Sequence, residues 1–183
     1  MSKEIIVTVF GSSRPREGSP DYEDARVLGR ALAKHSFAVC SGGYAGVMEA
    51  VSRGAKEAGG KTYGVTAEFF KSAKLNPWID VEIHKETWEE RLFELIRMGH
   101  GFVACKGGTG TLVELAVVWE MLNKAVMAAK PFVVLGDFWR PILDRVREVE
   151  LGNAASWGEA NGRLVKVAPT AAQAADFLGE KLI

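Results

Sequence analysis

GFVACKGGTGTLVELAVVWE, residues 101–120, is the stretch that decides how the rest of the chain is arranged. Residues 101–105 are apolar without alternation, which is typical of a parallel strand covered on both faces. The glycine-rich turn that follows comprises Gly107, Gly108, Thr109, Gly110 and Thr111. Its glycines let the backbone approach a ligand closely. A helix is expected to begin near Thr111 or Leu112, so that its free N–H groups face the turn. This arrangement suits an anion, above all a phosphate.

Two charged residues near this stretch are candidates for a site. Glu114 is expected in the first turn of the helix, where it either belongs to the site or only complements the helix dipole. On an expected helix over residues 87–98, Arg91 and Met98 share one face. Arg91 is either a solvated residue on the helix surface or part of a site. Its face is either core covered by an arginine stem or the wall of a pocket, in which Met98 would contact a nucleotide.

Composition places the chain among ordinary globular proteins. It has 183 residues, 48% hydrophobic and 25% charged, which predicts one domain spanning residues 1–183. The formal net charge of +0 argues against nucleic-acid or membrane-surface binding. Apolar runs are shorter than the roughly 20 residues that span a bilayer. Cys40 and Cys105 each end an expected strand, so buried free thiols and a cytoplasmic location are expected.

Strand and helix patterns alternate along the chain. Strands are expected at residues 5–10, 37–41, 61–65, 79–84, 101–105, 131–135 and 164–167. Helices are expected at residues 22–34, 47–58, 87–98, from about 111, 137–149 and 170–182. This alternation predicts an α/β fold: a Rossmann-like, doubly wound, mostly parallel sheet of about seven strands with helices on both faces. Residues 79–84 alternate in polarity, which favours a place near the sheet edge.

Three turns join a strand to a helix and are expected along one sheet edge. They are Gly11-Ser12-Ser13, Ser41-Gly42-Gly43 and the turn of residues 107–111. The Gly42-Gly43 pair is equally consistent with a simple tight turn. Neither GxxxxGK[ST] nor GxGxxG occurs, so a ligand with one phosphate fits better than a triphosphate or NAD. HExxH and CxxC are also absent, so metal binding is not predicted.

Several motifs in order resemble those of the LOG family, the cytokinin riboside 5′-monophosphate phosphoribohydrolases. The family signature P-G-G-x-G-T-x-x-E is similar to KGGTGTLVE at residues 106–114. A family Gly-Ser-Ser turn is matched by residues 11–13, and its Gly-Gly-x-x-Gly-Leu-Met element by residues 42–48. The essential arginine of the family, on the helix before the signature strand, aligns with Arg91. The resemblance covers roughly residues 5–144.

The resemblance implies hydrolysis of the N-glycosidic bond of a nucleoside 5′-monophosphate, such as AMP or a cytokinin riboside monophosphate. Arg91 and Glu114 would be the catalytic residues, with the helix N-terminus favouring ionised Glu114. The glycine turn would hold the phosphate, and Ser12 and Ser13 would contact phosphate or sugar. No cofactor is implied, and a homodimer or larger even homo-oligomer is. The lysine-decarboxylase label that many family members carry has no support in this sequence.

The chain also departs from the family pattern. Lys106 replaces the signature proline, where it either adds a phosphate contact or loosens the turn. Molybdenum-cofactor carrier proteins are similar in fold and in their glycine turns. A non-catalytic nucleotide or cofactor carrier is therefore the alternative to a hydrolase.

Overall fold

Seven strands and six α-helices alternate along the part of the chain that the structure describes, residues 4–70, 72–152 and 163–183 of a computed structural model. The strands are β1 (Ile6–Phe10), β2 (Ala38–Ser41), β3 (Thr62–Ala67), β4 (Val81–Lys85), β5 (Gly101–Ala104), β6 (Phe132–Leu135) and β7 (Val165–Ala168). The helices are α1 (Pro20–Lys34), α2 (Val47–Glu57), α3 (Trp88–Met98), α4 (Thr109–Asn123), α5 (Arg140–Gly152) and α6 (Ala171–Leu182). A 3-10 turn, η1, covers Glu68–Phe70.

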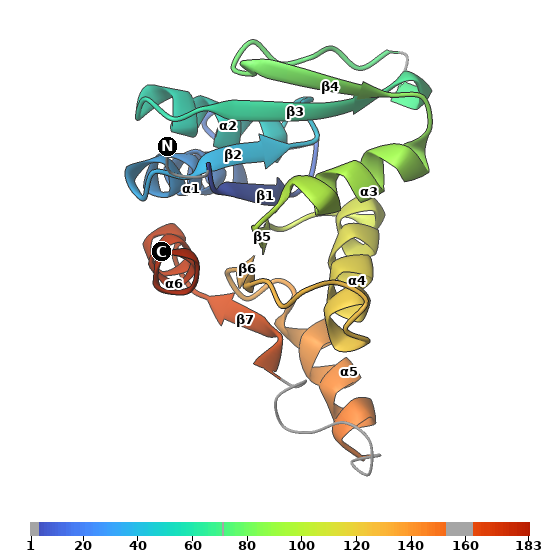
Figure 1. Cartoon of the computed structure of the whole chain (residues 1–183). Helices are drawn as coiled ribbons and strands as arrows, with labels where there is room; N and C mark the ends of the chain where they lie inside the picture. The colour runs from blue at the N-terminus through green and yellow to red at the C-terminus, as the bar shows by residue number, and fades with distance from the viewer. Residues whose placement is uncertain (1–3, 71, 153–162) are drawn as a thin grey trace.

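All seven strands are parallel and lie in the order β4-β3-β2-β1-β5-β6-β7 (Figure 1). The predicted doubly wound α/β fold is therefore confirmed, as is the place of β4 at the sheet edge. The strand order reverses between β1 and β5, whose carboxyl ends lie side by side. Ligands of open parallel sheets bind at such a reversal.

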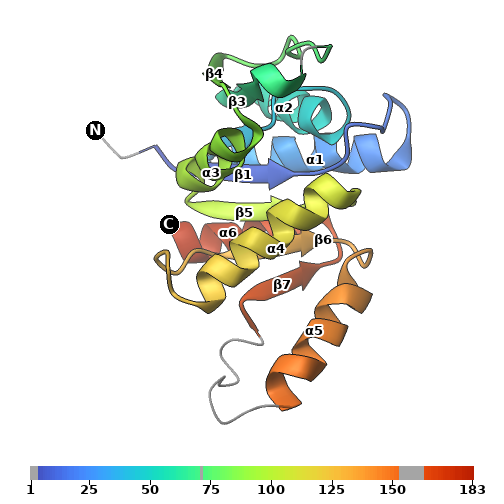
Figure 2. The ribbon, with the colours of Figure 1, turned by 90° about the vertical axis from the view of Figure 1, so that its right-hand side faces the viewer.

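Two helical layers cover the sheet, and the alternation of side chains along each strand decides which layer a residue meets. Val7 and Val9 of β1 pack with α1, α2 and α6. Ile6 and Phe10 of the same strand face α3, α4 and α5. Figure 2 shows this second layer in front of the sheet, with α4 running across it. Because both faces are covered, β6 carries apolar residues at every position, and the polar Thr8 of β1 is buried as well.

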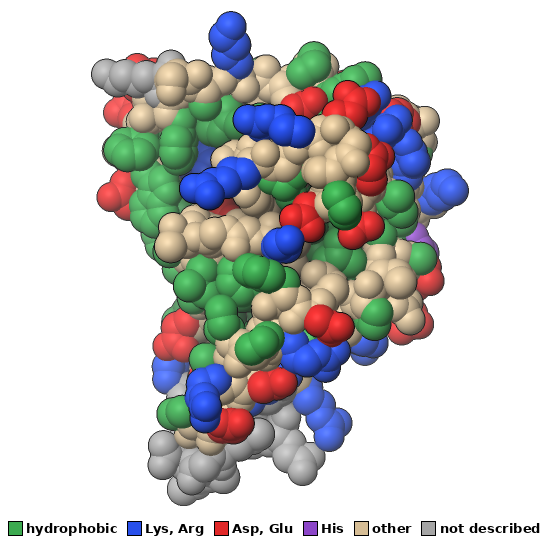
Figure 3. All heavy atoms as spheres, turned by 180° about the vertical axis from the view of Figure 1, so that it is seen from behind, with side chains coloured by type: hydrophobic (Ala, Val, Ile, Leu, Met, Phe, Trp, Pro, Cys, Tyr) green, Lys and Arg blue, Asp and Glu red, His purple; other side chains and the backbone are tan. Residues whose placement is uncertain are grey.

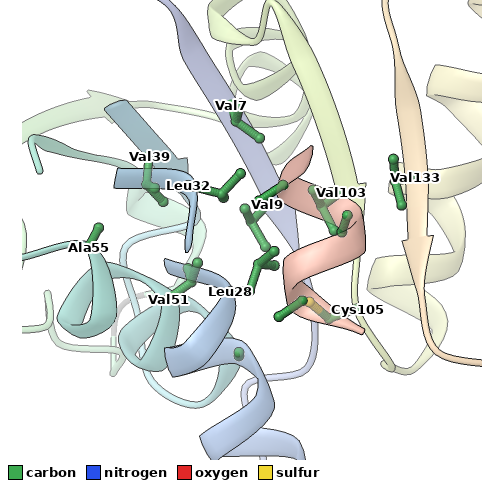
Figure 4. Close-up of a cluster of buried hydrophobic side chains, with 14 of the residues drawn as sticks. Val7, Val9, Leu28, Leu32, Val39, Val51, Ala55, Val103, Cys105 and Val133 are labelled. Atoms are coloured by element: carbon green, nitrogen blue, oxygen red, sulfur yellow. The ribbon is translucent and has the colours of Figure 1, made fainter. Parts of the chain in front are cut away.

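The core between α1, α2 and the sheet is built from branched aliphatic side chains. Figure 4 shows Leu28 and Leu32 of α1 lying against Val9 and Val103, with Val51 of α2 beside them. Leu28, Leu32 and Val51 are fully buried. Burying one such side chain contributes roughly 1.5–3 kcal/mol. This layer holds β1 and α2 together. The turn after β1 and the turn before α2 both lie at the carboxyl edge of the sheet.

Most predicted elements occur within a few residues of their expected bounds, and two local predictions are confirmed in detail. Thr87 and Glu90 form a capping box at the start of α3. Cys40 and Cys105 are buried free thiols. Side chains of both charge signs are interspersed over the rear face of the molecule (Figure 3). No helix within the described residues is both long and apolar enough to cross a membrane.

Candidate active site

The three strand-to-helix turns meet at the carboxyl edge of the sheet, as predicted. The N–H of Ser12, after β1, donates to the carbonyl of Lys106, after β5, over 3.3 Å. The N–H of Val47, the first residue of α2, donates to the carbonyl of Ser12 over 2.8 Å. Gly46 has a φ of 71°, and a Cβ there would lie 2.4 Å from that same carbonyl oxygen. Glycine at this position therefore lets the turns after β1 and β2 come into contact.

The glycine-rich turn ends earlier than predicted, because α4 begins at Thr109 with Gly108 as its N-cap. Gly108 lacks a capping side chain, so the first N–H groups of α4 have no side-chain acceptor there. A Cβ at Gly108 or Gly110 would meet nothing within 4 Å. Both glycines and Thr109 are exposed. The helix N-terminus is therefore open to an anion, as the sequence indicates.

Thr111 does not share this exposure. It is buried, and its Oγ1 would lie 2.1 Å from a Cβ on Gly107, so the hydroxyl packs closely against that glycine. Thr109 is thus better placed than Thr111 to offer a hydroxyl to a ligand. Ser13 is exposed, whereas the Oγ of Ser12 accepts a hydrogen bond from the N–H of Arg14 at 3.1 Å.

Arg91 lies inside the protein, with only 6% of the residue exposed. Its Nε donates to the carbonyl of Val65 over 2.7 Å, and one terminal nitrogen donates to the carbonyl of Gly42 over 3.1 Å. The guanidinium carbon lies 5.4 Å from the ring centroid of Tyr44 and 5.3 Å from that of Phe70. The interpretation of Arg91 as part of a pocket wall therefore fits better than a solvated arginine on the helix surface.

Glu114 interacts with Arg91 through its charge. The hydrogen bonds of the guanidinium go to two backbone carbonyls and to the sulfur of Met48. Part of the Glu114 residue is reached by solvent, but its carboxyl is desolvated. Desolvation raises the pKa of Glu114 to about 7, and the positive charge of Arg91 opposes that rise. Burial also lowers the pKa of Arg91, against the effect of Glu114. A carboxyl that titrates near neutrality can donate or accept a proton during a reaction.

Two sequence expectations about Glu114 are wrong. The first turn of α4 contains no acidic residue, because the helix begins at Thr109 and places Glu114 in its second turn. The helix dipole acts mainly within the first turn. Ionised Glu114 is consequently not favoured by the helix N-terminus, and burial moves its pKa in the opposite direction.

Gly42 leaves room for the arginine. A Cβ there would lie 1.8 Å from a terminal nitrogen of Arg91 and 2.6 Å from the sulfur of Met48. That sulfur is 3.9 Å from the same nitrogen. Gly43 has a φ of 77°, a backbone conformation that favours glycine. The glycine pair therefore does more than connect a strand to a helix: Gly42 makes room for Arg91, and Gly43 adopts a positive φ.

The structure does not bring Met98 together with the other predicted site residues. It is the last residue of α3, and α3 leads into the amino end of β5, whereas the turns lie at the carboxyl end. Its side chain packs on the core beneath α3 and α4. The helical spacing that groups Met98 with Arg91 is correct, but two turns of helix carry it away from the sheet edge. Met48 is the methionine that contacts the arginine.

Sequence reasoning missed the aromatic surroundings of Arg91. Tyr44 accepts from the N–H of Ala67 over 2.9 Å, which fastens the turn after β2 to the end of β3. Its ring lies edge-on to Phe70 at 5.5 Å. Both residues stand in stretches that the sequence marks as loops, and an aromatic residue directly after a glycine pair was the available signal.

Lys106 does not point its charge at the glycine turn. Its Nζ lies 2.9 Å from a carboxylate oxygen of Asp21 in α1 and 5.9 Å from the ring centroid of Phe138. All three residues line a cavity of about 410 Å³ near the carboxyl ends of β5 and β6. The lysine thus links the end of β5 to α1. This position favours neither of the two roles expected for Lys106, a phosphate contact or a loosened turn.

Metal-binding geometry is absent from the described ranges: no group of three or more His, Cys, Asp or Glu side chains there could hold an ion. The site instead consists of a buried arginine, a carboxyl with a raised pKa and an open helix N-terminus, brought together from α3 and α4. This combination can bind an anion and exchange a proton.

Comparison with known proteins agrees with this architecture. The model of the SLOG cluster4 family matches residues 4–153. The chain is 30% identical over 174 residues to the rice (Oryza sativa subsp. japonica) protein named cytokinin riboside 5′-monophosphate phosphoribohydrolase LOG, covering 91% of this chain and 69% of that protein.

Solved structures of molybdenum-cofactor proteins share the fold. The molybdenum cofactor binding protein of Rippkaea orientalis superposes with a TM-score of 0.74 over the whole of both chains, at 23% identity. The molybdenum cofactor carrier protein of Chlamydomonas reinhardtii superposes with a TM-score of 0.71 at 25% identity, covering 98% of this chain and 99% of that one.

Proposed function

Because the chain belongs to the SLOG cluster4 family, we propose that it hydrolyses the N-glycosidic bond of a nucleoside 5′-monophosphate, giving the free base and ribose 5-phosphate. One observation carries the proposal. A buried guanidinium and a carboxyl with a pKa of about 7 interact beside an open helix N-terminus. The relation to the rice phosphoribohydrolase supports the choice of reaction.

In this proposal the 5′-phosphate binds at the N-terminus of α4. Backbone N–H groups of the turn donate to the phosphate oxygens, and exposed Thr109 adds a hydroxyl. The Ser13 side chain, on the adjoining turn after β1, is exposed and is within the same edge of the sheet. A single phosphate, rather than a triphosphate, suits a turn without a Walker lysine.

Glu114 then acts at the ribose. Breaking the bond from C1′ to the base nitrogen builds positive charge on the sugar ring, which an ionised carboxylate stabilises. Glu114 in that form can also accept a proton from the water that attacks C1′. The departing base takes a proton in exchange. Because its pKa is about 7, a large share of Glu114 is ionised at neutral pH.

Arg91 favours the ionised form of the Glu114 carboxyl. Its charge lowers the pKa of Glu114, and its two backbone hydrogen bonds fix the guanidinium. One terminal nitrogen also contacts the sulfur of Met48, and the other terminal nitrogen would donate to a ligand. The Tyr44 and Phe70 rings on which it lies extend the apolar wall of the site toward a base.

A non-catalytic nucleotide or cofactor carrier is the second candidate. The likeness to the C. reinhardtii carrier protein over nearly the whole of both chains favours it. Lys106, in place of the proline of the hydrolase signature, is a further difference from the enzymes. The carrier would use the same helix N-terminus for an anionic group of its cargo.

Incubation with AMP separates the two candidates. The hydrolase releases adenine and ribose 5-phosphate in equal amounts, measured by chromatography. Glu114→Gln and Arg91→Lys should each lower the rate at least about a hundredfold, the lower range for loss of general acid–base catalysis. Glu120→Gln, on the exposed side of α4, is the matched control and should retain the wild-type rate.

Binding without turnover decides against the hydrolase. If calorimetry detects AMP binding but no adenine appears, the protein is a carrier. If AMP binds neither the wild type nor Glu114→Gln, the assignment of the glycine turn to a nucleoside monophosphate is wrong.

We also propose a homodimer. α4 is apolar around most of its circumference, and Phe93 of α3, on the same face of the sheet, is 54% exposed. Val113 and Val117 are only partly buried by the chain itself. A second copy covering Phe93 and Val117 would remove this apolar surface from water. Light scattering should give twice the chain mass, and Phe93→Glu should give the monomer mass.

A further inference from the structure

The cavity of about 410 Å³ that Lys106 lines is separate from the candidate active site, since neither Arg91 nor Glu114 lines it. Its wall is formed by α1, the first residue of α2, the first turn of α6 and the loops after β5, β6 and β7. Cys105 in this wall packs in the core with α1 and α6, whereas Arg91 comes from α3 on the other face of the sheet. The volume is within the range of small-molecule sites.

Aspartates supply most of the charge on the cavity wall. Asp21 and Asp24 stand one helical turn apart on α1, and Asp137 lies in the loop after β6. Burial, followed by the charges of Asp24 and Asp21, raises the pKa of the Cys105 thiol to about 12. Both carboxylates of α1 therefore lie on the side of the helix that faces the cavity and Cys105.

Lys106 shows that this wall can hold an ammonium group. Its Nζ lies 2.9 Å from a carboxylate oxygen of Asp21 and 5.9 Å from the ring centroid of Phe138. A carboxylate and the face of an aromatic ring both attract a cation. The cavity thus contains one cation that belongs to the chain itself, and its partners are an aspartate and a phenylalanine ring.

A second carboxylate in the wall has no counter-charge. Lys106 neutralises Asp21, and Arg140, which does not line the cavity, lies 2.6 Å from a carboxylate oxygen of Asp137. Asp24 is exposed, and no side chain among residues 4–70, 72–152 and 163–183 forms an ion pair or hydrogen bond with it. One further positive charge would therefore balance the aspartates of the wall.

Much of the remaining wall is apolar. Ala25 of α1 and Val47 of α2 are buried, Leu135 ends β6, and Phe138 is 47% exposed at the rim. An apolar body placed against these side chains would exchange water for hydrocarbon contact. An uncompensated negative charge thus stands beside an apolar surface in the same cavity.

We propose that this cavity binds a small organic cation, a primary ammonium group on a compact apolar body. The ammonium group donates to the carboxylate of Asp24, and the apolar body lies against Leu135 and the Phe138 ring. An anion would be repelled by the aspartates. A metal ion does not fit, since the described part of the chain has no group of three or more side chains that could hold one.

The probe is phenethylamine, and two other compounds share its phenethyl body. 2-Phenylethanol has a hydroxyl in place of the ammonium group, and phenylalanine adds a carboxylate. Binding of each is measured by calorimetry at pH 7. Phenethylamine should bind about threefold to tenfold more tightly than 2-phenylethanol, a modest factor because water screens the exposed Asp24. It should also bind more tightly than phenylalanine, whose carboxylate would meet the aspartates.

Two substitutions should shift the affinity for phenethylamine in opposite directions. Asp24→Asn removes the unpaired charge, so binding should weaken about threefold to tenfold, with 2-phenylethanol binding nearly unchanged. Lys106→Gln removes the chain's own cation and frees Asp21, so binding should tighten by about twofold to fivefold. Asp176→Asn is the matched control, an exposed aspartate of α6 outside the cavity, and should bind phenethylamine as the wild type does.

Ala172→Leu tests the location. Ala172 is an exposed residue in the first turn of α6 and lines the cavity, so leucine there fills space without disturbing the core, and phenethylamine binding should be lost. Ala129→Leu makes the same change at an exposed alanine in the loop after α4, away from the cavity, and should leave binding unchanged.

Four results would overturn the proposal. Equal binding of phenethylamine and 2-phenylethanol would mean that the cavity does not recognise the charge. Tighter binding of phenylalanine would assign the cavity to a zwitterion, with its carboxylate at the N-terminus of α6. Unchanged binding in Ala172→Leu would place the amine elsewhere on the protein. No phenethylamine binding by the folded wild type would mean that Lys106 is the only cation that the cavity accepts.

Discussion

Glu114→Gln should remove a pH dependence of stability that comes from one buried carboxyl. Desolvation raises the pKa of Glu114 from 4.5 to about 7 in the folded protein. The folded state therefore binds more protons than the unfolded chain between these two values. Stability from this group is fully present below about pH 4.5 and is lost as pH rises through about 7.

The magnitude follows from that difference in pKa. At 1.36 kcal/mol per unit, it corresponds to about 3 kcal/mol in the free energy of unfolding. Most of this falls between about pH 5 and pH 8. Glutamine keeps the size of the side chain but does not titrate, so the variant should lack this slope.

Urea denaturation of both proteins across this pH range measures the effect. Every other titrating group is common to the two, so it cancels in the difference between them. The free energy of unfolding of the wild type should fall by about 2–3 kcal/mol relative to Glu114→Gln on going from about pH 5 to pH 8. Parallel curves would refute the conclusion that the Glu114 carboxyl is desolvated, and with it the proton-exchange role proposed for it.

Three other changes test particular contacts. Gly42→Ala should displace Arg91, because the new Cβ would lie 1.8 Å from its guanidinium nitrogen, and adenine release and the melting temperature should both fall. Arginines of α1 hold the pKa of Glu57 down to about 2. This carboxylate therefore stabilises the protein above about pH 4.5 and loses that effect as pH falls through about 2. Glu57→Gln should flatten the acid limb of a plot of melting temperature against pH. Burial raises the pKa of the Cys40 and Cys105 thiols to about 12, so neither should react with iodoacetamide until urea unfolds the chain, as mass spectrometry can measure.

Matched controls exist for the first two of these changes. Gly110→Ala places a Cβ in open space within α4, so its melting temperature should equal or slightly exceed that of the wild type. Glu148→Gln removes an exposed carboxylate whose ion pair, among the described residues, is with Arg145 three residues before it, and should leave the acid limb unchanged. A Gly42→Ala protein as stable as Gly110→Ala would contradict the described position of Arg91.

Much of the candidate site could be inferred before any coordinates were known. Glycines that precede a helix, and a strand before them without alternation, place an anion-binding turn at a sheet edge through local chemistry alone. The expected start of α4 was two residues late because Thr109 and Gly110 are weak helix formers in isolation. In the fold they continue the helix, and this moves Glu114 from its first to its second turn.

The environment of Arg91 could not be inferred in the same way. Its hydrogen-bond acceptors are carbonyls of Val65 and Gly42, which are 26 and 49 residues away along the chain. Backbone carbonyls leave no trace in residue identity, and so no pattern in the sequence points to them. The position of Met98 could not be inferred either. Spacing along a helix shows which residues share a face, but not which end of the sheet each residue lies near.

The amino-acid sequence by itself determined the alternation of strands and helices, the parallel sheet and the three turns, because these depend on periodicity and on glycine at a few positions. The tertiary structure decided the chemistry. Burial, which depends on what surrounds a side chain, turned Arg91 from a helix-surface candidate into a fixed interior charge. Burial also moved the pKa of Glu114 to about 7, opposite to the direction that its place near a helix start indicates. Desolvation depends on contacts between distant segments, and only the folded chain contains them.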